Sequence, residues 1–134
     1  MVFKRCNSCH QLFTGKECPT CAAKRQKKRL NDVHSRKLYG SHKWRKCRGN
    51  AIIRYAGYDI WKMGIGIILQ CRHPVVHHIL ERDEAPELIY NLDNLITCTV
   101  DSHVEIHEAY RRNKHAAIAR IRRGIESYKE LFND

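Results

Sequence analysis

The sequence lacks the features of a membrane-spanning, exported or acidic protein. Its apolar runs, such as Ile65–Leu69, are far shorter than the roughly 18 residues that span a bilayer. The first ten residues, MVFKRCNSCH, contain no apolar stretch of the kind found in secretory signals. Acidic residues are few, with 14 Asp and Glu against 25 Lys and Arg in 134 residues. We therefore expect a cytoplasmic protein without membrane association, whose net charge of +11 suits a negatively charged partner.

The positive charge is concentrated in the first third of the chain. Residues 1–48 contain 14 Lys and Arg but only two acids, whereas residues 49–134 contain 11 basic and 12 acidic side chains. A concentrated basic segment is typical of nucleic-acid binding, because each neutralised phosphate releases condensed counterions. A solvated, solubilising segment is the alternative, and charge alone does not distinguish DNA from RNA.

Four cysteines form the pattern C-x2-C-x8-C-x2-C, namely Cys6, Cys9, Cys18 and Cys21. Two thiolate pairs of this spacing can complete a tetrahedral shell around one ion. Without an export signal, the pattern predicts one structural zinc ion, and two disulfide bonds are the alternative. His10 could replace one ligand, but four thiolates already suffice.

A basic segment follows these cysteines. Residues 22–37 contain no Gly or Pro and many helix-favouring residues, which predicts a basic helix or an arm that orders on nucleic acid. Gly40 breaks it, and Ser41 is placed to cap a second helix with Trp44 as its core anchor. The basic side chains expected to contact DNA are Lys24, Arg25, Lys27, Lys28, Arg29, Lys43, Arg45, Lys46 and Arg48.

Two β-prone runs are expected in the middle of the chain. Residues 67–71 and 75–80 flank the tripeptide RHP, which indicates a hairpin. A polar loop that contains Pro86 follows. The expected order is therefore strand, strand, loop and helix.

The remaining residues, from Thr97 onward, are predicted to form a helix. Ser102 with Glu105 fits a capping box at its start, and Thr99 is an earlier possible cap. A break or cap is expected near Asn113, and strain at Gly124.

Histidines fall where these elements meet. His103 and His107 lie four residues apart, which places them on one helix face, and His77 at the end of the second strand could complete a three-ligand metal site. Such a site leaves coordination positions for water and a phosphate oxygen. Taken singly, each histidine would more often be an ordinary surface or core residue. Their joint arrangement favours a metal centre.

The segment VVHHILERDEAPELIYNLDNLITCTVDSHVEIH resembles the HNH endonucleases, which have a ββα-metal fold. The PEL…LDNL segment and the upstream YGSHKWRKCR are most similar to small HNH proteins of bacteriophages and prophages. The resemblance covers roughly Leu38–Lys114. It implies a metal-dependent endonuclease that hydrolyses DNA phosphodiester bonds.

The resemblance also implies a role for each matched residue. His77 and His103 match metal-ligand positions, and His107 matches the additional histidine of the nuclease colicins. His78 matches the general base that activates water, and Asn94 matches the middle Asn that pins the loop by hydrogen bonding. Because adjacent strand residues point to opposite faces, His77 and His78 serve one site only if the strand bends.

Two departures from the family are visible. Many relatives carry paired cysteines around the nuclease core, but Thr99 and Ser102 stand near the expected positions here. The other three cysteines, Cys47, Cys71 and Cys98, have no metal-binding spacing and are expected to be core residues or free thiols. The second departure is His77 where relatives often have Asp, which favours zinc, nickel or manganese over magnesium.

Together these inferences predict an α+β chain of three segments. A four-cysteine zinc-binding module (1–22), a basic helix or linker (23–40) and an HNH nuclease domain with a long C-terminal helix (41–134) are expected. The implied cofactors are one structural Zn and one catalytic divalent metal, Zn, Mn, Ni or Mg. Duplex DNA is the expected partner, and the phage resemblance leaves open a role beside a terminase. Arg72, Arg111 and Arg112 could clamp phosphate or be solvated surface residues.

Two alternatives stay open. The chain could be a zinc-dependent DNA-binding protein whose HNH unit is degenerate and without catalysis. It could instead be a nuclease that cleaves RNA.

Overall fold

The computed structural model describes residues 2–132, without the side chain of His34, and divides into two compact units, Met1–Ser41 and His42–Asp134. Helices combine with two small antiparallel sheets, so the predicted α+β class is confirmed, as is the long C-terminal helix. None of the helices within residues 2–132 combines the length and apolar character needed to span a bilayer.

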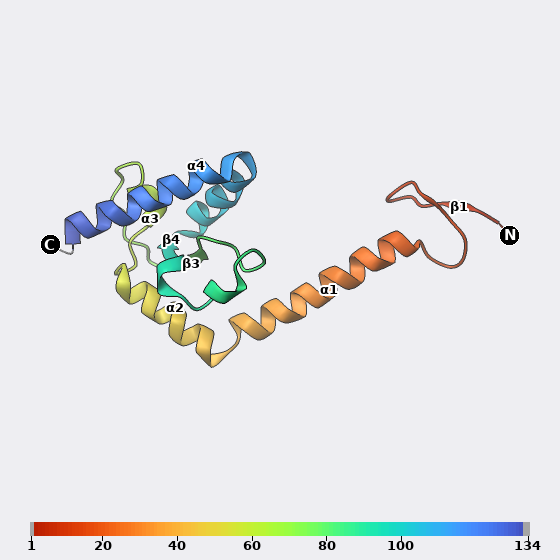
Figure 1. Ribbon diagram of the computed structural model, residues 1–134, viewed down its shortest axis with the longest axis horizontal. Coiled ribbons are helices and arrows are strands. Elements are labelled where there is room, and N and C mark those ends of the chain that lie inside the picture. Colours follow the sequence, from red (N-terminus) through yellow and green to blue (C-terminus); the bar gives the residue numbers. More distant parts are fainter. Residues whose placement is uncertain (1, 133–134) are drawn as a thin grey trace. The chain divides into compact units, whose positions relative to one another are not determined.

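The N-terminal unit consists of a short hairpin and one helix. Strand β1 (Lys4–Arg5) pairs with β2 (Leu12–Phe13), and α1 (Pro19–Tyr39) follows as a continuous helix (Figure 1). Pro19 suits the first helical position because it has no N–H to leave unpaired. The helix contains the whole of the stretch 22–37 in which the sequence predicts one.

Residues 42–132 of the C-terminal unit contain three α-helices, two short 3-10 helices (Pro86–Leu88 and Leu92–Asn94) and one two-stranded sheet. The α-helices and strands are α2 (His42–Arg54), α3 (Ile60–Met63), β3 (Val75–His78), β4 (Leu95–Cys98) and α4 (Val100–Phe132). Strands β3 and β4 are antiparallel, with Val75 opposite Cys98 and His78 opposite Leu95. The observed order is strand, loop, strand and helix.

The predicted hairpin between residues 67–71 and 75–80 is wrong. β3 pairs with β4, and the segment 67–71 makes only an isolated bridge from Gln70 to Tyr58. The apolar side chains of Ile65–Leu69 are exposed, so they contribute little to the core that a paired strand would share. The sequence does not predict β4, because all four of its residues are buried and it joins α4 almost directly. A short run without alternation cannot be distinguished from a buried helical segment by periodicity.

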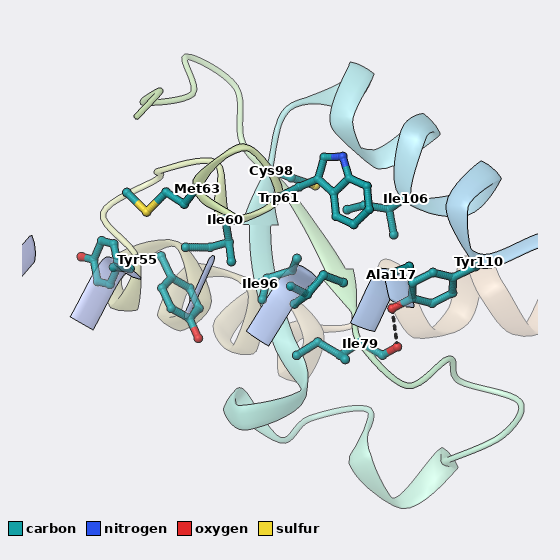
Figure 2. Close-up of a cluster of buried hydrophobic side chains, with 12 residues drawn as sticks. Tyr55, Ile60, Trp61, Met63, Ile79, Ile96, Cys98, Ile106, Tyr110 and Ala117 are labelled. Carbon is teal, nitrogen blue, oxygen red and sulfur yellow. Dashed lines mark hydrogen bonds between the residues drawn. The ribbon is translucent and has the colours of Figure 1, made fainter. Parts of the chain in front are cut away.

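The main core lies where α3, the sheet and α4 meet, and Figure 2 shows their side chains converging. Ile60 and Ile96 are completely buried there. Gly124 is not a point of strain: a side-chain carbon at this position would overlap the carbonyl oxygen of Ile60. Its missing side chain therefore permits α3 to cross closely over the second half of α4.

Helix α4 is two helices joined at Asn113, and Figure 1 shows the change of direction. The backbone of Asn113 is extended, and its Oδ1 accepts a hydrogen bond of 3.1 Å from the N–H of Ala116. The predicted break is confirmed, since the side chain caps the second half.

The start of α4 differs from the predicted capping box. Thr99 Oγ1 accepts a hydrogen bond from the N–H of Ser102 at 3.0 Å, so Thr99 is the cap. The Ser102 hydroxyl instead donates to the fully buried carboxylate of Asp59 at 2.7 Å. Asp59 also accepts from the N–H groups of Thr99 and Lys62, at 3.0 and 2.9 Å. This carboxylate ties the start of α4, and hence its histidines, to α3.

Candidate metal centres

Three histidines from two elements converge in the C-terminal unit. His77 comes from β3, and His103 and His107 come from the first half of α4. Ring nitrogens of all three, one from each, lie within 4.8 Å of one another, and the Nε2 atoms of His103 and His107 are 3.1 Å apart. His77 is buried, His103 is half-buried and His107 is exposed. The group is open on one side and could hold a metal ion.

The electrostatics of the group favour neutral imidazoles, the form that binds metals. Burial, followed by the neighbouring His103 and His107, lowers the pKa of His77 to about 3. Burial and His107 also lower the pKa of His103. The lone pairs of ring nitrogens this close together, such as the two Nε2 atoms 3.1 Å apart, repel one another unless a proton or a cation lies between them.

The ring of His77 is also in contact with a tyrosine hydroxyl of α4. Its Nε2 lies 3.2 Å from the hydroxyl oxygen of Tyr110, and that hydroxyl donates to the carbonyl oxygen of Ile79 at 2.6 Å. Tyr110 was not among the site residues predicted from the sequence. Its position three residues after His107 places it on the same helix face, and this signal could have identified it.

His78 lies on the other face of β3 and contacts different elements. Its ring stacks on Trp44 of α2, and its Nε2 lies 3.0 Å from the carbonyl oxygen of Ile89. Burial lowers the pKa of His78. The ring is not a member of the group formed by His77, His103 and His107. The two neighbouring histidines therefore lie in separate environments.

Asn94 joins the two ends of the loop between β3 and β4. Its side-chain amide accepts from the N–H of Leu80 at 2.8 Å and donates to the carbonyl of the same residue at 3.0 Å. A longer bond of 3.4 Å reaches the carbonyl of Leu88. Its own carbonyl accepts from the N–H of Ile79 at 2.8 Å. This buried side chain holds the loop that presents Ile89 to His78.

An open depression of about 480 Å³ adjoins His107. It is lined by Glu81, His107, Tyr110, Arg111 and Lys114. Of the predicted phosphate clamps, Arg111 lies here, whereas Arg112 lines a different groove and Arg72 lines neither. The depression thus places Arg111 and Lys114 beside His107, together with the acidic Glu81, and Lys114 is ion-paired with Glu84.

The four cysteines of the N-terminal unit also converge. The Sγ atoms of Cys6 and Cys21 are 3.6 Å apart, as are those of Cys9 and Cys18, and all four lie within 4.8 Å of one another. Zn–S bonds of about 2.3 Å in a tetrahedron would separate the sulfurs by roughly 3.8 Å. A disulfide would need about 2.05 Å, and all seven cysteines are free thiols. The cluster could hold a metal ion, and His10 is not a member of it.

The surroundings of the cysteines favour a thiolate at Cys6 and a protonated thiol at Cys21. The backbone N–H groups of Cys9 and Ser8 lower the pKa of Cys6 to about 6. Hydrogen bonding to Cys6 raises the pKa of Cys21 to about 12. Several thiolates so close together need a cation to be stable.

The basic side chains proposed for DNA contact are all exposed. Those on α1 are Lys24, Arg25, Lys27, Lys28 and Arg29, and those on α2 are Lys43, Arg45, Lys46 and Arg48. Lys43 lies over the ring of Tyr90 at 4.1 Å, and Arg48 donates to the carbonyl of Pro74 at 3.0 Å.

Comparison of the chain with protein-family models, curated proteins and solved structures gives no match. The likeness to HNH endonucleases therefore rests on the motifs quoted above.

Proposed function

We propose that this chain is a metal-dependent HNH endonuclease that hydrolyses phosphodiester bonds of duplex DNA. The observation that carries the proposal is the convergence of His77 from a strand with His103 and His107 from a helix. The strand, the Asn94-held loop, the second strand and the helix follow one another as a ββα unit. In this proposal the four cysteines form the structural zinc module.

The donor set fits a divalent ion. Neutral imidazoles suit zinc and nickel and also accommodate manganese, whereas magnesium prefers oxygen ligands. His77, His103 and His107 would hold the ion, which when bound would stabilise negative charge on a phosphate oxygen as a Lewis acid.

His78 is the proposed general base. Its hydrogen bond determines which ring nitrogen carries the proton. A carbonyl oxygen only accepts, so the 3.0 Å contact with Ile89 requires the proton of His78 on Nε2. Nδ1 then carries a lone pair that can take a proton from water. Because burial lowers the pKa of His78, the ring is neutral at pH 7 and ready to accept that proton.

The chain's other residues would bind and position the phosphate backbone. Arg111 and Lys114 stand beside the histidines, and the exposed cations of α1 and α2 would contact flanking phosphates. Contacts of this kind position a duplex without reading its sequence.

A plasmid assay tests the proposal. Metal-stripped protein is incubated with supercoiled plasmid and Zn²⁺, Ni²⁺, Mn²⁺ or Mg²⁺ in turn, and nicked and linear forms are quantified. We expect cleavage that requires added metal and is greatest with an imidazole-preferring ion. His115→Ala, which removes an exposed histidine of α4 outside the group, should cut like the wild type. A His103→Ala sample that cuts equally fast would reveal a contaminating nuclease.

The second candidate is a zinc-dependent DNA-binding protein without catalysis. The exposed cations of α1 favour it, because they lie in a unit separate from the histidines. Binding to duplex DNA without cleavage under every metal would support this candidate. Cleavage of an RNA duplex or hairpin, with plasmid untouched, would instead indicate a ribonuclease.

A further inference from the structure

A chain of two hydrogen bonds connects His77 to the protein backbone. The Tyr110 hydroxyl lies 2.6 Å from the carbonyl oxygen of Ile79, a contact drawn in Figure 2, and 3.2 Å from Nε2 of His77. Both side chains are buried, with 9% of Tyr110 and 3% of His77 exposed. Water is therefore poorly placed to replace either bond.

Counting protons fixes the direction of both bonds. A backbone carbonyl only accepts, so the single proton of the Tyr110 hydroxyl belongs to the bond with Ile79. The hydroxyl oxygen is then left to accept, and the donor to it must be an N–H at Nε2 of His77. In neutral His77 the lone pair is consequently on Nδ1.

We propose that Tyr110 is a positioning residue that holds His77 with its proton on Nε2 and so presents Nδ1 to the metal ion. The inference rests on the proposed metal site formed by His77, His103 and His107. It makes the three ligands unequal: Nε2 of His103 and Nε2 of His107 face each other at 3.1 Å, whereas Nε2 of His77 is already used. Fixing both tautomer and ring orientation before binding removes an ordering cost from metal capture.

Loss of the hydroxyl has a defined consequence. Tyr110→Phe would keep the aromatic packing but leave the Ile79 carbonyl and the Nε2–H of His77 without their partner. The ring of His77 could then rotate or change tautomer. Removing an outer partner of a metal-binding histidine weakens metal binding by about 10- to 100-fold in general.

The tautomer is measured first, in metal-free wild-type protein. Long-range ¹H–¹⁵N correlation spectra of ¹⁵N-labelled protein distinguish protonated from unprotonated ring nitrogens, and His77→Gln assigns the signals. We expect His77 to be protonated on Nε2 and unprotonated on Nδ1. A proton on Nδ1 would overturn the inference, whatever the behaviour of any variant.

Metal affinity is measured second. Ni²⁺ is titrated calorimetrically into the full chain, and His103→Ala identifies the heat that belongs to the histidine group. We expect Tyr110→Phe to bind Ni²⁺ about 10- to 100-fold more weakly than the wild type. Tyr128→Phe removes the same hydroxyl from a buried ring in the same helix, where its neighbours are Tyr55, Tyr58 and Phe132, and should leave the affinity unchanged.

The outcomes separate this inference from the proposed function. Ni²⁺ binding that requires His103 but is unaltered in Tyr110→Phe overturns the role of Tyr110 alone. If no Ni²⁺ binding depends on His103, both the role of Tyr110 and the proposed metal site are overturned. Circular dichroism checks that Tyr110→Phe is folded, and if it is not, the wild-type tautomer decides the matter.

Discussion

The ring of Trp44 stacks on the ring of His78, with centroids 5.0 Å apart and planes 23° from parallel. The tryptophan holds one face of the imidazole while the carbonyl of Ile89 holds its Nε2–H. His77, the next residue back along β3, is held instead by Tyr110 and faces α4. One short strand, regularly paired with β4 through both residues, thus gives two adjacent histidines different partners, and the bend that would bring both rings to one face is not observed.

The crossing of α3 and α4 gives a prediction about stability. Gly124→Ala should lower the free energy of unfolding by about 1–3 kcal/mol, because the added carbon overlaps the Ile60 carbonyl. Gly49→Ala is the matched control in α2: its added carbon meets nothing within 4 Å, so it should stabilise by roughly 0.5–1 kcal/mol. Urea unfolding followed by tryptophan fluorescence measures both, since Trp44 and Trp61 lie in the C-terminal unit. Equal effects of the two substitutions would contradict the close crossing.

The low pKa of buried His77 predicts that the free energy of unfolding of the metal-free protein depends on pH. An unfolded imidazole takes up a proton below about pH 6.5, whereas the pKa of folded His77 is about 3. Between these values the unfolded state binds more protons, so stability should fall as pH drops from 6.5, by up to about 1.4 kcal/mol per unit. Above pH 6.5 both states are neutral at this residue and it contributes no slope.

Fluorescence-detected urea unfolding at pH 7.5, 6.5, 6.0 and 5.5 tests this dependence. His77→Gln should flatten the slope below pH 6.5, and some slope should persist because the pKa of His103 is lowered as well. An identical slope in wild type and variant would show that His77 is protonated in the folded state.

The cysteine cluster predicts one tightly bound zinc ion. Protein purified without added metal should contain it, and replacing Cys6 and Cys9 by Ser should remove about one equivalent by elemental analysis. Cys71→Ser, which alters a half-buried thiol outside the cluster, should leave the zinc content unchanged. Two disulfides found by non-reducing mass spectrometry would contradict a metal site here.

The exposed cations of α1 predict salt-dependent DNA binding. Replacing Lys27, Lys28 and Arg29 by Ala should weaken binding and reduce the slope of log affinity against log salt by about 1 for each phosphate that is no longer neutralised. A control with the same charge change replaces three exposed cations of α4, Arg122, Arg123 and Lys129. Fluorescence anisotropy with labelled duplex measures both. If the two triple variants have the same slope, α1 is not the DNA-binding surface.

Sequence alone predicts part of this molecule. His103 and His107 lie on one face of a helix because they are four residues apart. The cysteine pairs can bind one ion because of their C-x2-C spacing. Both metal-ligand sets could therefore be predicted from local sequence without knowing the fold. The partner of β3 could not, because pairing with β4 depends on burial contributed by α2, α3 and α4 together. Asp59 was missed for a similar reason: its partners Thr99 and Ser102 lie 40 and 43 residues away in the sequence.

The most direct test of the account measures metal affinity and plasmid nicking together in two variants. His78→Ala removes the proposed base but none of the three grouped histidines, so Ni²⁺ affinity should persist while nicking falls about 10²- to 10⁴-fold. His103→Ala removes a ligand, so affinity and nicking should fall together and recover in part with excess metal. A His78→Ala protein that cuts as fast as the wild type, or that loses its metal as His103→Ala does, would contradict the assignment of His78 as the base.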